Sequence, residues 1–258
     1  MNGLRDRALA LLLEPEPGRK AEGARTLGLD DAIDPSVAMA EPAGIPGRPA
    51  RPALVAHTEI RQRSVHTLQG RGALLHAIAH IELNAIDLAL DAIWRFPGLP
   101  DAYYGDWARV AREEALHFSL LREHLRVLGF EYGDFPAHAA LWEMAQRTAG
   151  DVLARMALVP RTLEARGLDA SPGVRAKLAS AGDAAGAAII DLILRDEIGH
   201  VAIGNHWYRW LCAQRGLDPL ATYTDLADHH RAPRLRGPFN HSARRAAGFT
   251  DAEIEQLG

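Results

Sequence analysis

The pattern of apolar and polar positions predicts long helices in the middle of the chain. Apolar residues recur at steps of three and four along four stretches, as they do on one face of an α-helix. Each stretch ends near glycine or proline, which stop helices. Pro160 falls inside the third stretch and is expected to kink or divide it. The four predicted helices cover approximately residues 71–96, 101–128, 137–167 and 183–214.

The flanking segments lack this period. Residues 14–72 are rich in proline and glycine and predict an irregular segment that is either partly disordered or wraps over the surface of a core. A short amphipathic helix is expected from Met1 to Leu13, Ser171-Pro172 predicts a helix start, and Thr250 is expected to cap a last short helix. The predicted all-α protein therefore has three parts. They are an N-terminal helix and irregular wrap over residues 1–70, a four-helix bundle over residues 71–216, and a basic C-terminal segment over residues 217–258, packed on the same domain.

Six polar side chains interrupt the apolar faces of these helices. A glutamate and a histidine three residues apart lie one turn apart on the same face, so both can reach one point. This Glu-x-x-His spacing occurs twice, and a single glutamate precedes each pair by 32 or 33 residues. A buried carboxylate needs a partner, and a metal ion provides one. The six candidate ligands are Glu82, Glu114, His117, Glu164, Glu197 and His200.

This set matches the two-metal sites of four-helix bundles, in which two helices supply one glutamate each and two supply Glu-x-x-His. Four carboxylates balance two divalent ions, and the donors suit two iron ions, with manganese or a mixed manganese–iron pair as alternatives. Asp196 and Glu113 each precede a candidate ligand, and either could accept the second ring N–H of a ligand histidine on a facing helix, the alternative being an ordinary solvated acid. The alternative is that all these groups are solvated charges on helix faces.

Composition and charge narrow the classes of function. Apolar residues make up 48% and charged residues 24%, which is an ordinary balance for a globular protein. The net charge of −4 argues against general affinity for nucleic acids. A single cysteine, Cys212, excludes an intramolecular disulfide and any cysteine-built metal site. The sequence predicts neither a signal peptide nor a membrane span, so a cytoplasmic location is expected.

Four motifs carry a resemblance to a known family. They are Ala79-His80-Ile81-Glu82, Glu113–Phe118, Leu163–Asp169 and Asp196–His200. In these motifs the chain resembles the bacterial domain-of-unknown-function family 455 and, more broadly, the ferritin-like superfamily. The resemblance implies a ferritin-like four-helix bundle with a dimetal site, and it carries no settled reaction. In ligand order alone, the chain is also distantly similar to the ferritin-like tRNA hydroxylase.

The leading hypothesis is a non-haem di-iron oxidoreductase, which would use O2 and an electron donor to hydroxylate or desaturate a small organic substrate. The alternatives are a ferroxidase or peroxide scavenger, a hydroxylase of tRNA or a nucleotide, and a dimetal binding module without catalysis. A homodimer is compatible with the pattern.

The basic segment 229–245 contains five arginines and no acid. It is expected to be solvated surface, scattered or paired with Asp225 and Asp228. A phosphorylated or nucleic-acid substrate gains support only if these arginines line the mouth of the site. The arginines are Arg231, Arg234, Arg236, Arg244 and Arg245.

Overall fold

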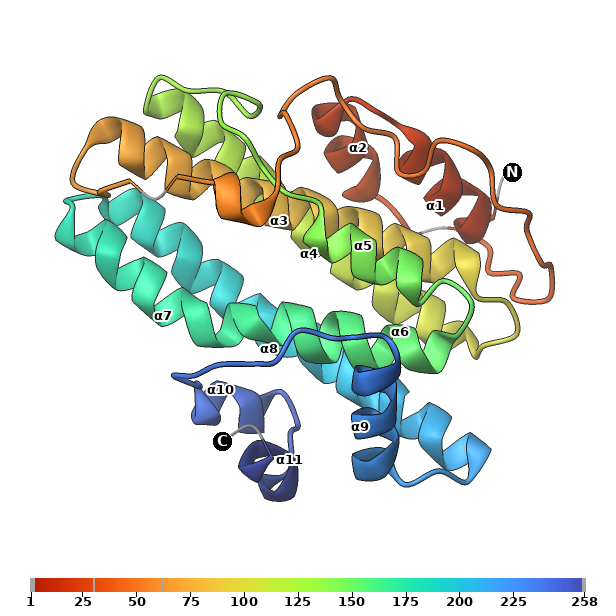
Figure 1. Cartoon of the computed structure of the whole chain (residues 1–258). Coiled ribbons are helices and arrows are strands. Elements are labelled where there is room, and N and C mark those ends of the chain that lie inside the picture. Colours follow the sequence, from red (N-terminus) through yellow and green to blue (C-terminus); the bar gives the residue numbers. More distant parts are fainter. Residues whose placement is uncertain (1–2, 30, 62, 257–258) are drawn as a thin grey trace. The chain divides into compact units, whose positions relative to one another are not determined.

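The computed structural model describes residues 3–29, 31–61 and 63–256 (Figure 1). Helices dominate these residues, and the described ranges contain no β-strand, only an isolated bridge between Leu54 and Ala137. The prediction of an all-α fold is therefore confirmed. The chain divides into two compact units, residues 1–140 and residues 141–258. Met1 and Asn2, which belong to the predicted first helix, lie outside the described residues.

Unit 1 is built on two long antiparallel helices that pack along their lengths. Thr67 caps the first of them by accepting a hydrogen bond from the amide of Gly70, and a short turn at Gly98, with φ of 77°, joins it to the second. The two shorter N-terminal helices pack against this hairpin, one on each long helix. Both long helices were predicted to within about three residues. The elements of unit 1 are α1 (Leu4–Leu13), α2 (Pro17–Ala24), η1 (His57–Glu59), α3 (Leu68–Arg95) and α4 (Asp101–Val127).

The prediction that residues 14–72 are irregular is wrong for α2. Pro17 stands at the first helical position, where its missing N–H removes no helix bond. The carboxylate of Glu16 caps the helix by accepting from the amides of Gly18 and Arg19. The proline-rich stretch thus ends α1 and also starts a second helix.

A buried ion pair ties α2 to α3. Lys20 on α2 is 2% exposed, and its ammonium group contacts the carboxylate of Asp87 and also donates to the carbonyl of Gly47 at 3.0 Å. Burial raises the pKa of Asp87 to about 6, although Lys20 acts in the opposite direction. The pair therefore locates the N-terminal segment on α3 at a net desolvation cost.

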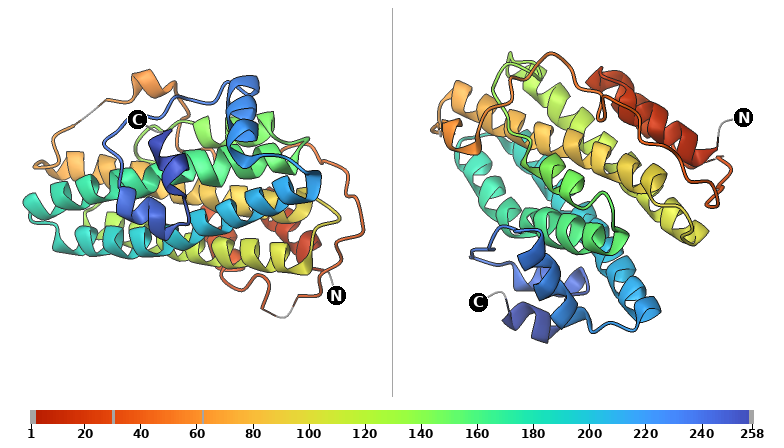
Figure 2. Two further views of the ribbon diagram at one scale, coloured as in Figure 1. Left: turned by 90° about the horizontal axis from the view of Figure 1, so that it is seen from below. Right: turned by 45° about the vertical axis from the view of Figure 1, so that its right-hand side comes forward.

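Unit 2 contains a second antiparallel hairpin, formed by α7 and α8. Asp183 caps α8 through the amide of Gly186, and Gly216, with φ of 65°, ends it in the left-handed conformation. Thr250 caps the last helix as predicted. Figure 2 shows these elements from two further directions. They are α5 (Ala140–Arg147), α6 (Val152–Leu158), η2 (Val159–Glu164), α7 (Ala165–Ser180), α8 (Ala184–Arg215), α9 (Pro219–His229), α10 (His241–Ala246) and α11 (Asp251–Glu255).

Two predictions in this part of the chain need correction. The expected helix over residues 137–167 is divided, but not at Pro160: the non-helical residues 148–151 separate α5 from α6, and Pro160 lies in a π-helical turn, η2. The expected helix start at Ser171-Pro172 is also wrong, since α7 runs through it.

Pro172 is tolerated inside α7 because the carbonyl that it leaves without a helix donor finds another partner. Proline has no N–H to donate to the carbonyl four residues earlier, which here belongs to Leu168. The side-chain amide of Asn240 donates to that carbonyl at 3.1 Å. The hydroxyl of Ser171 donates to the carbonyl of Gly167 at 2.7 Å. A side chain from another segment therefore completes the helix.

The basic segment is not uniformly solvated. Arg244 is buried and forms a bidentate pair with Asp169, with distances of 2.6 and 3.0 Å, so the prediction of solvated surface is wrong for this residue. Arg245 pairs with Asp251 at the surface. Arg231, Arg234 and Arg236 are exposed, as expected.

Among the described residues, α3 alone is long and apolar enough to cross a membrane. In its most apolar window, 72% of the residues are buried inside the protein. That degree of burial is typical of the core helix of a globular protein.

Removal of the Lys20 ammonium group should destabilise unit 1. We expect Lys20→Met to lower the free energy of unfolding by about 3–5 kcal/mol, because the variant leaves Asp87 buried without its cation. The double variant Lys20→Met/Asp87→Leu should recover most of this loss, since no buried charge is left. Urea unfolding at neutral pH measures both. A double variant as unstable as the single one would show that lost packing, and not the unpaired charge, is responsible.

Candidate metal centre

Two carboxylates and one imidazole meet inside the hairpin of unit 1. Glu82 lies on α3, while Glu114 and His117 lie one turn apart on α4. The Nδ1 atom of His117 is 3.1 Å from Oε2 of Glu82 and 3.3 Å from Oε2 of Glu114. All three side chains are buried. We call these three residues the α3–α4 half-site.

The long helices bring these groups to the same height. Glu82 and Glu114 are 32 positions apart. Antiparallel helices of nearly equal length, joined by a short loop, place residues at such a separation opposite each other. The sequence spacing therefore predicted this encounter correctly.

The electrostatics of the α3–α4 half-site favour a cation. Burial and the neighbouring carboxylate of Glu114 raise the pKa of Glu82 well above its ordinary value. Burial by itself lowers the pKa of His117, but its bonds to Glu114 and Glu82 outweigh this effect and raise the pKa. His117 is therefore protonated at neutral pH in the metal-free protein. Its Nδ1 atom lies between two carboxylate oxygens, where a bound cation would also be held.

The donor atoms of the α3–α4 half-site are suitable for a transition metal. One ligand atom from each of its three residues lies within 4.8 Å of the other two. One nitrogen and two carboxylate oxygens form a set that iron and manganese accept. These three residues can therefore hold a metal ion.

Unit 2 presents the second Glu-x-x-His pair on α8. The Nδ1 atom of His200 lies 3.2 Å from Oε2 of Glu197, and both side chains are buried. Glu164, the last residue of η2, is also buried. Gly167, three residues further on, lies next to Glu197, and a Cβ atom there would be in ordinary van der Waals contact, 3.6 Å from Glu197 Cγ. We call the three predicted ligands of unit 2, Glu164, Glu197 and His200, the α7–α8 half-site.

The burial of all six candidate ligands excludes the alternative of solvated helix faces. Asp196 accepts hydrogen bonds from the guanidinium group of Arg195, at 2.8 and 3.2 Å. Glu113 is half-buried on α4. The predicted roles of Asp196 and Glu113 beside the ligand histidines remain predictions.

Two buried histidines on α3 have partners within unit 1. The Nε2 atom of His76 accepts from the amide of Gly133 at 2.8 Å. His80 contacts the hydroxyl of Tyr132 through Nδ1 at 2.7 Å and the carbonyl of His138 through Nε2 at 3.1 Å. Burial lowers the pKa of each histidine to about 4, so both are neutral at physiological pH. They fix the segment that follows α4.

Sequence reasoning missed a charged cluster close to Glu164. Arg161 on η2 is 4% exposed and bonds to Asn205 on α8 and Glu253 on α11. A lone arginine beside a proline has no periodic signature. The partner segments lie 44 and 92 positions away, so neither the spacing nor the local composition indicates the cluster.

The fold and the cluster of carboxylates and imidazoles define an all-α protein with a candidate metal site built from helix residues. Comparison with known sequences makes the assignment more specific. The chain belongs to the family described as "Protein of unknown function (DUF455)", whose model matches residues 14–255. The family resemblance read from the motifs is therefore confirmed.

A relative from Haemophilus influenzae, described as an uncharacterized protein, is 55% identical over 216 residues. The match covers 81% of this chain and 75% of the relative. No solved structure matches the chain.

Metal binding to the α3–α4 half-site should release protons. His117 must give up its Nδ1 proton to bind a metal through that atom, so Mn²⁺ affinity should rise as the pH rises from about 6 to 8. Calorimetric titration in two buffers of different ionisation enthalpy measures the number of protons released. We expect the release of at least about one proton for each metal ion that binds. Equal heats in both buffers would contradict a ligand that is protonated in the metal-free protein.

Proposed function

We propose that the two half-sites together form one dinuclear metal centre, in which four carboxylates and two imidazoles hold two iron ions. The observation that carries this proposal is the buried cluster of Glu82, Glu114 and His117. Each half-site offers only two carboxylates and one imidazole, which leaves a single ion with open coordination positions. The Glu-x-x-His motif occurs twice in the chain. A centre shared by the two half-sites is therefore the simplest way to fill the open coordination positions of both ions, as in the ferritin-like bundles that the motifs resemble.

Iron is favoured over structural zinc because the chain offers no thiolate ligand in this set and because four carboxylates suit two hard divalent ions. Manganese, alone or paired with iron, fits the same donors. Two bound iron ions supply the activation of O2.

The residues of the chain would bind the metal ions, exchange protons with them and shield them from water. The carboxylates compensate the charge of the ions, and His117, whose pKa is raised, exchanges its proton for a metal bond. The candidate ligand side chains are themselves buried, which keeps bulk water from the centre. This environment supports an O2-dependent oxidoreductase that hydroxylates or desaturates an organic substrate with electrons from a separate donor.

Elemental analysis of the purified protein tests the metal centre. We expect about two iron or manganese ions per chain. The double variant Glu114→Ala/Glu197→Ala should lose them, because it removes one carboxylate from each half-site. Glu123→Ala, which removes an exposed carboxylate from the same helix as Glu114, is the matched control and should keep the metal. Unchanged metal content in the double variant would refute the ligand assignment.

Oxygen consumption separates the oxidoreductase from a metal-handling protein. Reduced, iron-loaded protein should consume O2 in a fixed ratio to its bound metal, and a reductant with a suitable substrate should sustain the reaction. An oxygen electrode and iron analysis follow both quantities. Continued uptake of many iron ions per chain would instead identify a ferroxidase or storage protein.

A further inference from the structure

The turn that carries Glu164 has an unusual shape and is held from outside. It is the π-helical turn η2, in which each helical turn is wider than in an α-helix. Pro160 lies in it and donates no backbone hydrogen bond. The hydroxyl of Thr162 donates to the carbonyl of Ala157 at 2.8 Å. Such a turn needs support beyond its own backbone to keep one geometry.

Part of this support is close packing against α8. An ideal Cβ atom on Gly204 would lie 2.5 Å from the Cβ of Pro160, so only glycine allows η2 to approach α8 this closely. Gly204 lies one turn of α8 beyond His200. Packing thus fixes the beginning of η2 next to the helix that carries the other two members of the α7–α8 half-site.

The rest of the support is electrostatic and comes from Arg161. Its guanidinium donates to Oδ1 of Asn205 at 2.7 Å and to Oε1 of Glu253 at 2.8 Å. The rings of Tyr208, Tyr223 and Phe249 lie 4.9 to 5.2 Å from its central carbon. A desolvated guanidinium among aromatic rings is held by its carboxylate and by cation–π attraction, and it has little freedom to move.

Glu253 connects this arginine to the C-terminal helices. Its other oxygen accepts from Arg209 at 2.7 Å and from the amide and hydroxyl of Thr250 at 2.7 and 3.0 Å. Burial alone would raise the pKa of Glu253, but Arg161, the Thr250 amide and Arg209 together lower it. Both oxygens of the carboxylate are therefore used, and the group is ionised at neutral pH.

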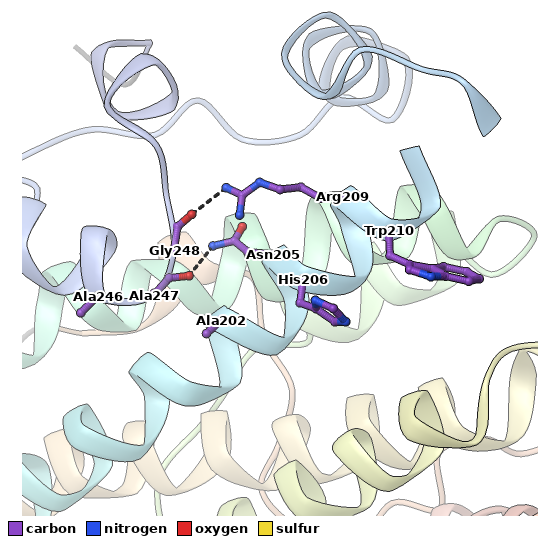
Figure 3. Close-up of a pocket in the computed structure, with 8 residues that line it drawn as sticks. All are labelled: Ala202, Asn205, His206, Arg209, Trp210, Ala246, Ala247 and Gly248. Carbon is purple, nitrogen blue, oxygen red and sulfur yellow. Dashed lines mark hydrogen bonds between the residues drawn. The ribbon is translucent and has the colours of Figure 1, made fainter. Parts of the chain in front are cut away.

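Side chains of α8 also donate hydrogen bonds to the backbone of the segment that leads into α11. Figure 3 shows Asn205 donating to the carbonyl of Ala247 and Arg209 donating to the carbonyl of Gly248, at 2.8 and 2.6 Å. Asn205 thus accepts from Arg161 and donates to the segment that leads into α11. The network connects η2, α8 and the C-terminal segment without a gap.

We infer that Arg161 and Glu253 are positioning residues, which hold η2 in the shape that directs Glu164 toward the metal ion proposed to bind Glu197 and His200. Glu164 follows Arg161 by three residues, so a shift of the guanidinium is transmitted through less than one helical turn. The inference rests on the proposed metal centre. It assigns a role in metal binding to a C-terminal helix that contains none of the candidate ligands.

The test uses Glu253→Gln, which keeps the shape and the acceptor for Thr250 but removes the charge that Arg161 requires. The matched control is Asp169→Asn, which breaks another buried arginine pair between the same C-terminal segment and α7. Co²⁺ titration, followed by visible absorption, reports the affinity and geometry of each ion. Amide hydrogen exchange over residues 159–165 reports the order of η2 in the metal-free protein.

We expect Glu253→Gln to lower the affinity for one of the two Co²⁺ ions by about 10–100-fold and to change the visible spectrum of that ion. The variant should also speed amide hydrogen exchange in η2. Asp169→Asn should lower the melting temperature by a similar amount but leave the cobalt spectrum and the exchange of η2 unchanged. Equal effects of both variants, or no effect of Glu253→Gln, would overturn the inference while wild-type Co²⁺ binding still supports the proposed function. Failure of the wild-type protein to bind Co²⁺ would refute the proposed function itself.

Discussion

The burial of carboxylates among helices is the constraint on which the rest of this structure depends. Glu82 and Glu114 lie in the core, where ionised groups are costly unless something compensates them. In the metal-free protein the raised pKa of His117 favours a positive charge on its ring, and the raised pKa of Glu82 favours its neutral form. Both effects reduce the net negative charge of the buried cluster. A hydrophobic core of this size would be more stable without these groups. Their presence therefore indicates a functional requirement, not a contribution to folding.

The two units present their candidate ligands in physically different ways. In unit 1, two uninterrupted helices place the groups by register alone, and each ligand is held by a regular helical backbone. In unit 2, α8 does the same for Glu197 and His200, but Glu164 sits at the end of a π-helical turn. Irregular backbone needs specific partners, which are supplied here by Arg161, Glu253 and the close approach of Gly204. The two half-sites therefore offer similar donor atoms, but a regular helical backbone positions those of unit 1, whereas side-chain contacts and close packing help to position Glu164 in unit 2.

Sequence reasoning succeeded where a single periodic pattern determines the structure. The helices around Glu82, Glu114 and Glu197 follow from apolar spacing, and the meeting of Glu82 with His117 follows from helix length and a short loop. It failed where a distant segment decides the outcome. Pro172 appears to be a helix start until Asn240 supplies the partner for the carbonyl of Leu168, and Arg244 appears solvated until Asp169 pairs with it. Such compensations join residues about 70 positions apart and leave no local signal.

The link between Arg161 and Glu253 also has a consequence for the entropy of folding. It joins residues 92 positions apart, whereas the contact between His117 and Glu82 spans 35. Contacts that close longer loops form more slowly, because more chain entropy must be lost before they are made. The contact in the α3–α4 hairpin therefore closes the shorter loop, whereas the turn that carries Glu164 depends for its support on a segment much further along the chain. The chain entropy lost in holding Glu164 in place is therefore greater than that lost in bringing Glu82 and His117 together.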